Sequence, residues 1–158
     1  MNSRVILFCN PFAKERRNPM GRVTTPVVIR NRHEERLARD GQLAPESVHS
    51  IEVADALVDT GASTICLPPS LIALLDLVPD ERRKIRTAGG LREMTIFSEV
   101  TLTIQDRQAI TRVVEVPEGT PVLIGQIPLE EMDLIVHPLA RTVIPNPAHG
   151  GEWTLEIY

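Results

Sequence analysis

The chain has 158 residues, of which 24 % are charged, and its formal net charge at pH 7 is −4. This length fits one domain, and a hydrophobic content of 42 % is too high for a disordered chain. Charges of both signs are interspersed, and the densest basic run, residues 82–86, is short and follows two acids. The composition therefore gives no electrostatic case for a nucleic-acid partner, and we expect none.

The hydrophobic residues predict a mostly β fold. Aromatic residues make up 3 % of the chain, so the core must consist of valine, isoleucine and leucine. Valine and isoleucine favour strands because their branched side chains are restricted in a helix. Thirteen prolines and nine glycines divide the chain into short elements. We therefore expect an all-β domain with one or two short helices.

The cysteines and the lengths of the apolar runs indicate in which cellular compartment the protein resides. Cys9 and Cys66 form neither a disulfide framework nor a paired metal motif. Cys66 lies in an apolar run, residues 64–67, and we expect it to be buried as a small hydrophobic residue. No apolar stretch approaches the roughly 20 residues that span a bilayer. We expect a cytoplasmic protein in a reducing compartment, with no membrane partner.

The histidines give no sign of a metal centre. They are scattered along the chain at His33, His49, His137 and His149. None has a second histidine or a cysteine at the spacing of a metal-binding helix or loop, so we predict neither a metal site nor a cofactor.

The breakers and apolar runs predict the following elements in chain order. Residues 1–19 end in a charged run and a proline, and we interpret them as an N-terminal leader before a domain of residues 20–158. Strands are expected at 22–31, 51–58, 64–67, 84–87, 91–97, 100–104, 109–116, 121–125, 134–136, 141–144 and 153–157. Short helices are expected at 34–39, 71–75 and 128–132. The first helix lies in a long polar connection, residues 31–50.

One turn carries candidate chemistry. The apolar strand 51–58 leads directly into Asp59-Thr60-Gly61-Ala62-Ser63. A carboxylate at such a place is costly unless it is hydrogen-bonded or exposed for a purpose. By itself Asp-Thr-Gly is typical of a plain turn, in which the acid bonds to nearby amides. The flanks are more informative, because a second apolar strand ends at Ile124-Gly125 and a glycine-tipped hairpin lies between the two strands.

These residues resemble the retropepsin-like aspartic proteases. Val58-Asp59-Thr60-Gly61-Ala62-Ser63 matches that family's catalytic motif, and Leu123-Ile124-Gly125 matches its second signature. Residues 129–138 are similar to the helix and strand of small bacterial members. The resemblance covers residues 20–147.

The resemblance implies an aspartic endopeptidase on a closed, retropepsin-like barrel that works as a homodimer. It assigns catalysis to Asp59, Thr60 and Gly61. It assigns substrate binding to Ala62, Ser63, Ala88, Gly89, Gly90 and Gly125, with residues 88–90 as the tip of a flap over an extended peptide. The chain has one Asp-Thr-Gly and is too short for the two-lobed form, so a second copy must supply the other carboxylate.

Two departures leave alternatives open. Retroviral members usually have an acid where Ser63 stands and many have an arginine where Gln126 stands. A catalytically weak or inactive peptide-binding module on the same fold is one alternative, and a structural β domain with Asp59 as a turn cap is another. The apolar C-terminus, residues 153–158, is either ordinary core closure or a strand of the dimer interface.

Overall fold

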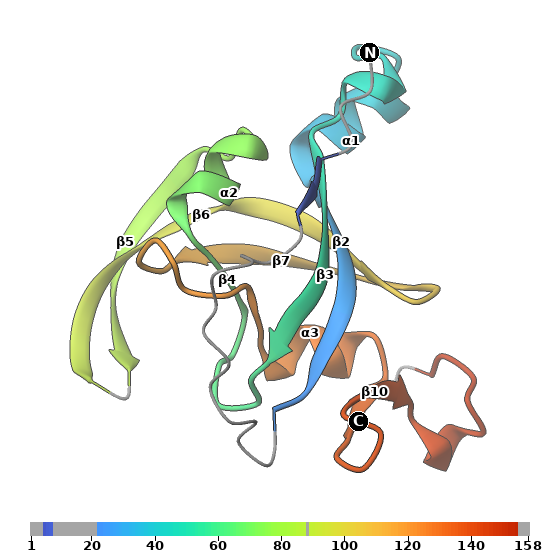
Figure 1. Cartoon of the computed structure of the whole chain (residues 1–158). Helices are drawn as coiled ribbons and strands as arrows, with labels where there is room; N and C mark the ends of the chain where they lie inside the picture. Colours follow the sequence, from blue (N-terminus) through green and yellow to red (C-terminus); the bar gives the residue numbers. More distant parts are fainter. Residues whose placement is uncertain (1–4, 8–21, 88, 155–158) are drawn as a thin grey trace.

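The computed structural model describes residues 5–7, 22–87 and 89–154, and strands dominate it (Figure 1). The strands are β1 (Val5–Leu7), β2 (Thr24–Asn31), β3 (Ser50–Val58), β4 (Ile65–Leu67), β5 (Pro79–Thr87), β6 (Gly90–Ile104), β7 (Arg107–Glu115), β8 (Leu123–Ile124), β9 (Leu134–His137) and β10 (Thr142–Pro145). The helices are α1 (Arg32–Arg39), α2 (Pro69–Leu74) and α3 (Gln126–Glu131), with single turns η1 (Pro45–Ser47) and η2 (Pro147–His149). The mostly β fold predicted from composition is confirmed.

Eight strands form one sheet, and β9 and β10 form a second, two-stranded sheet. In the large sheet, pairing runs from β3 through β2, β6, β7, β4 and β8, and β8 then pairs with β3. The hydrogen-bonded path thus returns to the strand from which it began. β1, which lies within the predicted leader, pairs with the first half of β3, and β5 pairs with β6.

The strand β6 differs from the prediction. We expected separate strands at 91–97 and 100–104, but β6 is continuous from Gly90 to Ile104. Its first part pairs with β5 and its second part with β7, and the register with β7 shifts between Phe97 and Glu99. Such a bulge lets a strand bend and change partners without ending. The bulge falls at Ser98 and Glu99, which lie between the two strands that we expected.

The core is aliphatic, as predicted. Its fully buried side chains come from nearly every strand of the large sheet and from α3, and include Ile29, Ile51, Ile65, Leu102, Ile104, Val113, Ile124 and Leu129. Phe97 is the one aromatic residue of this cluster within the described part of the chain. No helix in that part has the length and apolar character that crossing a membrane requires.

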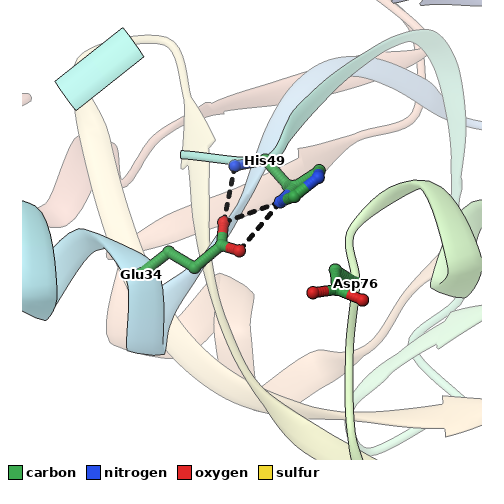
Figure 2. Close-up of side chains that lie close together, drawn as sticks. All are labelled: Glu34, His49 and Asp76. Atoms are coloured by element: carbon green, nitrogen blue, oxygen red, sulfur yellow. Dashed lines mark hydrogen bonds and ion pairs between the residues drawn. The ribbon is translucent and has the colours of Figure 1, made fainter. Parts of the chain in front are cut away.

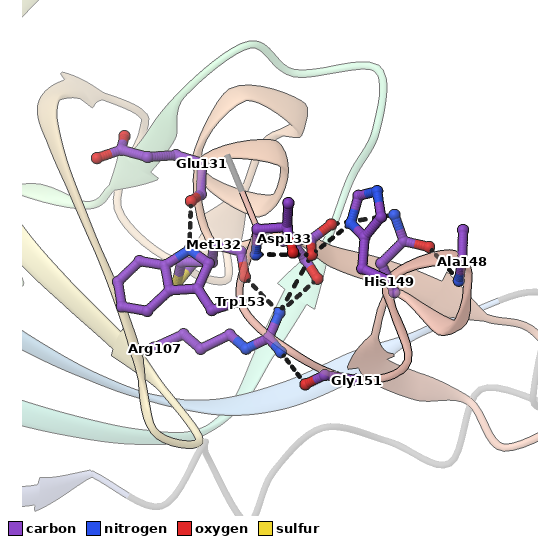
Figure 3. Close-up of polar contacts among 10 residues, drawn as sticks. Arg107, Glu131, Met132, Asp133, Ala148, His149, Gly151 and Trp153 are labelled. Atoms are coloured by element: carbon purple, nitrogen blue, oxygen red, sulfur yellow. Dashed lines mark hydrogen bonds and ion pairs between the residues drawn. The ribbon is translucent and has the colours of Figure 1, made fainter. Parts of the chain in front are cut away.

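The C-terminal segment is attached to the sheet by a buried arginine that the sequence analysis did not single out (Figure 3). Arg107 is 2 % exposed. Its Nη1 donates to the carbonyls of Met132 (2.9 Å) and Asp133 (2.7 Å), and its Nη2 donates to that of Gly151 (2.6 Å). The Asp133 carboxylate lies 3.8 Å from the same guanidinium.

The end of the described chain packs on the same network. The Trp153 ring nitrogen donates to the Glu131 carbonyl at 3.0 Å. Trp153 and Thr154 are not in a strand, and residues 155–157 of the expected last strand lie outside the described residues. The hydrogen bonds from His149 and then Asn146 hold the pKa of the Asp133 carboxyl below its ordinary value.

Replacing Arg107 should destabilise the fold. In Arg107→Met, three carbonyls lose a charged donor, and hydrogen bonds to charged groups contribute roughly 1.5–3 kcal/mol each. We expect the free energy of unfolding to fall by at least about 2 kcal/mol in urea titrations followed by circular dichroism. Arg82→Met, on the exposed side of β5, is the matched control. Equal unfolding midpoints for the two variants would contradict this role.

Candidate active site

Asp59 stands directly after β3, at the start of the predicted turn. Its backbone nitrogen donates to the Ile124 carbonyl of β8 at 2.9 Å, and its own carbonyl accepts from the Ala62 nitrogen at 3.0 Å. The Gly61 nitrogen donates to Asp59 Oδ1 at 2.9 Å, which orients the carboxylate. Asp59, Thr60 and Gly61 are all exposed. The acid is therefore fixed at its backbone and open at its side chain.

The segment that follows β8 holds the other side of the turn. The Gln126 nitrogen donates to the Ala62 carbonyl at 2.8 Å, and the Ile127 nitrogen donates to the Ser63 carbonyl at 3.2 Å. These bonds require the backbone at Gly125 to approach the turn closely. A Cβ atom at Gly125 would lie 2.5 Å from the Thr64 oxygen and 2.6 Å from the Ala62 oxygen. No side chain fits there, so glycine is required by close approach.

Thr64 secures the exit of the turn. Its Oγ1 bonds to the Arg112 carbonyl at 2.8 Å and lies 2.6 Å from Thr111 Oγ1, both on β7. The turn is thus hydrogen-bonded to two elements that are distant in sequence, β8 with α3 on one side and β7 on the other. The sequence analysis did not identify Thr64, because a threonine at a strand entry is ordinary.

A cavity of about 630 Å³ opens beside Asp59, between the turn and the β5–β6 hairpin. From the turn it is lined by Asp59, Gly61, Ala62, Ser63 and Thr64, and from the hairpin by Ile85, Arg86, Thr87, Gly89, Arg92 and Met94. Cys66, Leu123, Val114 of β7 and the segment after β7 complete the lining. The structure thus brings one predicted flap residue, Gly89, to the same cavity as the turn.

The remaining predicted residues lie elsewhere. Thr60 lines a second cavity, of about 730 Å³, together with α3 and β9. Gly90 begins β6 and Gly125 lies against the backbone of residues 62–64, and neither lines the cavity beside Asp59. Ala88 is outside the described residues.

The charges around the cavity were not anticipated. Arg86 and Arg92 line it, and Asp59 is its one acidic residue among those that the structure describes. Neither arginine makes an ion pair with any described residue. Arg92 lies opposite Ile85 in the β5–β6 hairpin, and both residues line the cavity. The register of the hairpin is therefore the signal that could have found Arg92. The cavity therefore presents two positive side chains beside one carboxylate.

Cys66 forms part of the cavity wall and is buried, as predicted. Burial, and then the negative charge of Asp59, raises the pKa of its thiol to about 11. The thiol therefore stays protonated at neutral pH, and the reactive thiolate of a cysteine nucleophile is absent there. Of these two residues, Asp59 is therefore the better candidate for a reactive group in this cavity.

The part of the chain that contains this turn matches a known protein family. The model of a family described as "gag-polyprotein putative aspartyl protease" matches residues 48–131, more than half of the chain. The chain belongs to this family. The matched residues include the Asp59 turn, the β5–β6 hairpin and Gly125, so the resemblance to retropepsin-like aspartic proteases is confirmed.

No curated protein matches the chain in sequence. Among solved structures, it is similar to EIAV protease complexed with the inhibitor HBY-793, at 22 % sequence identity and a TM-score of 0.44. That alignment covers 72 % of this aspartyl protease family member and 89 % of the EIAV chain.

Gly125→Ala should destabilise the fold because the added Cβ would meet backbone atoms of residues 62–64, which no rotamer change can move. Overpacking of this kind typically costs about 1–3 kcal/mol. We expect a loss of that size in urea unfolding. The matched control is Gly89→Ala, whose Cβ would meet Arg92 at an ordinary 3.5 Å. A Gly125→Ala protein as stable as the control would show that the close approach is not required.

In a Cys9→Ser background, Cys66 should react slowly with iodoacetamide, and its reaction rate should keep rising as the pH is raised toward 11. With a pKa of about 11, the thiolate fraction at pH 8.5 is more than about a hundredfold below that of an exposed cysteine. Because the folded pKa lies above the ordinary value, the fold should also lose stability as pH rises from 9.0 toward 11. Asp59→Asn should move the alkylation profile to lower pH. A rate that reaches its plateau near pH 9 would refute the assignment.

Proposed function

We propose that the chain is one subunit of a homodimeric aspartic endopeptidase. The observation that carries the proposal is the presentation of Asp59: its backbone is fixed by β8, while its carboxylate is open to a cavity under a hairpin. A turn cap requires the local bond to Gly61, but it does not require the bonds that hold the turn from β8, α3 and β7. We further propose that the domain spans residues 20–158.

The chemistry needs two carboxylates, and the chain has one Asp-Thr-Gly. Two carboxylates about 3 Å apart cannot both ionise easily and share one proton, as is general for aspartic proteases. The ionised Asp59 acts as general base on a water held between the pair, and the protonated partner polarises the scissile carbonyl. One carboxyl then protonates the leaving amine. Water attacks directly, so no covalent intermediate forms.

The face that carries Thr60 is the one we propose for contact with the second copy. The residues that line the Thr60 cavity include two exposed apolar side chains, Ile127 and Ile135, which are 57 % and 36 % exposed. A contact there, related by a twofold axis, brings the two Asp59 turns together and buries this apolar surface. The return of the strand pairing from β8 to β3 supports a closed barrel in each subunit.

Substrate is proposed to bind as an extended strand between the turn and the β5–β6 hairpin, which arches away from the body of the sheet in Figure 1. Backbone groups of Ala62 and Ser63 and the hairpin tip at Gly89 and Gly90 would hold it. Closure of the tip would exclude water from the reaction. The positive side chains in the cavity favour peptides that carry acidic residues near the cleaved bond.

A second candidate is a module on the same fold that binds peptides without cleaving them. Its support is Gln126, whose side chain donates to Glu130 at 2.7 Å within its own helix. The turn therefore lacks the arginine that braces many retroviral members at this position. This candidate predicts peptide binding without turnover.

Asp59→Asn should abolish cleavage. A panel of peptides with acidic and matched neutral residues is offered to wild type and variant between pH 4 and pH 8, with products identified by mass spectrometry. General acid–base groups contribute roughly 10²–10⁴-fold, so we expect at least about a hundredfold loss of kcat/KM. Asp55→Asn, on the strand β3 that leads to Asp59, is the matched control and should retain activity.

A mixing experiment tests the shared site. Refolding wild type with excess Asp59→Asn chains should lower the activity for each wild-type chain, because mixed dimers hold one carboxylate. Equal cleavage by wild type and Asp59→Asn, or a chain that remains monomeric in sedimentation at high concentration, would refute the proposal. Binding without cleavage by wild type would favour the second candidate.

A further inference from the structure

Three side chains that can bind metals lie together at the opposite end of β3 from Asp59. They are Glu34 on α1, His49 just before β3 and Asp76 just after α2, and Figure 2 shows them turned toward one another. One ligand atom from each lies within 4.8 Å of the others. The histidine that sequence spacing left without metal-binding neighbours therefore has two carboxylates beside it.

A single buried residue holds the backbone of all three. Asn31 is 4 % exposed. Its Oδ1 accepts from the Glu34 nitrogen at 3.2 Å, its backbone nitrogen donates to the His49 carbonyl at 3.0 Å, and its Nδ2 donates to the Asp76 carbonyl at 3.3 Å. Nδ2 also donates to the Leu75 carbonyl at 3.0 Å, which fixes the end of α2. The three candidate ligands are thus positioned by one group that does not itself bind the ion.

The three side chains differ in their hydrogen bonds, because Glu34 and His49 contact each other and Asp76 does not take part. Glu34 accepts from the His49 backbone nitrogen at 2.7 Å and lies 2.8 Å from the His49 ring nitrogen Nδ1. Asp76 has a φ of 50°, a left-handed conformation, and its carboxylate has no hydrogen-bond or ion-pair partner among the described residues. Among the described residues, the cluster therefore places an unpartnered Asp76 carboxylate beside the hydrogen-bonded Glu34 and His49.

We propose that Glu34, His49 and Asp76 bind a divalent transition-metal cation of the zinc type. One imidazole and two carboxylates are ligands that Zn²⁺ accepts, and three protein ligands leave a position for water. The imidazole argues against Mg²⁺ and Ca²⁺, which prefer oxygen ligands throughout. Binding would replace the contact between Glu34 and His49 by bonds from both side chains to the ion.

The bound ion would join three segments, α1, the start of β3 and the end of α2. Its effect is therefore expected on stability, away from the peptide cavity. A plain ion pair between Glu34 and His49 would account for those two residues, but it gives Asp76 no role. The contribution of Asp76 is thus the property that separates the two explanations.

The test uses the full chain, purified without a polyhistidine tag and treated with a chelator. Zn²⁺ is titrated by calorimetry and by thermal unfolding, and Co²⁺ is added separately to record the visible spectrum of a protein-bound ion. We expect one ion per chain, a rise in Tm, and a loss of affinity of at least about tenfold in both His49→Gln and Asp76→Asn. His33→Ala and Asp40→Asn, two exposed changes on or next to α1, are the matched controls.

The outcomes are separable. Loss of the Zn²⁺ effect in both cluster variants, with the controls unchanged, supports the site. No rise in Tm, or an equal rise in all variants, overturns it, as does an Asp76→Asn protein that binds like wild type. The variants' Tm values without metal report whether they fold. None of these measurements depends on peptide cleavage, so the result stands whether or not the chain is a protease.

Discussion

The close approach of Gly125 to the Asp59 turn is the constraint on which the candidate site depends. The backbone after β8 can donate to the Ala62 and Ser63 carbonyls because position 125 has no side chain. The same approach places the Ile124 carbonyl where the Asp59 nitrogen can donate to it. The acid is therefore held by backbone hydrogen bonds between distant segments, and its carboxylate, oriented by Gly61, remains exposed.

This arrangement gives the turn two different sides. On one side, Asp59 faces a cavity roofed by the β5–β6 hairpin and lined by Arg86 and Arg92. On the other, Thr60 lies among exposed apolar side chains of α3 and β9. The proposed dimeric peptidase would use both sides, one as a cleft for peptide and the other as a surface for the second copy. The proposed dimer accounts for the two sides together.

Much of the local structure followed from the sequence. The turn at Asp59, the helix within residues 31–50 and the burial of Cys66 were all predicted, because each depends on a few adjacent residues. The division of β6 into two strands was wrong. Polar residues at Ser98 and Glu99 indicate a break equally well whether a strand ends or bulges, and the choice depends on which strands lie alongside.

The sequence by itself determined the mostly β fold and the acid motif, since strand preference and turn chemistry are properties of neighbouring residues. The tertiary structure alone decided that Arg107 anchors the C-terminal segment, that Arg92 lines the cavity and that Glu34, His49 and Asp76 meet. It also showed that Gly125 is required because its backbone lies too close to residues 62–64 to leave room for a side chain. Except for Arg92, which the local register of the β5–β6 hairpin places, each of these depends on contacts between segments far apart in the chain. No spacing in the sequence encodes such contacts.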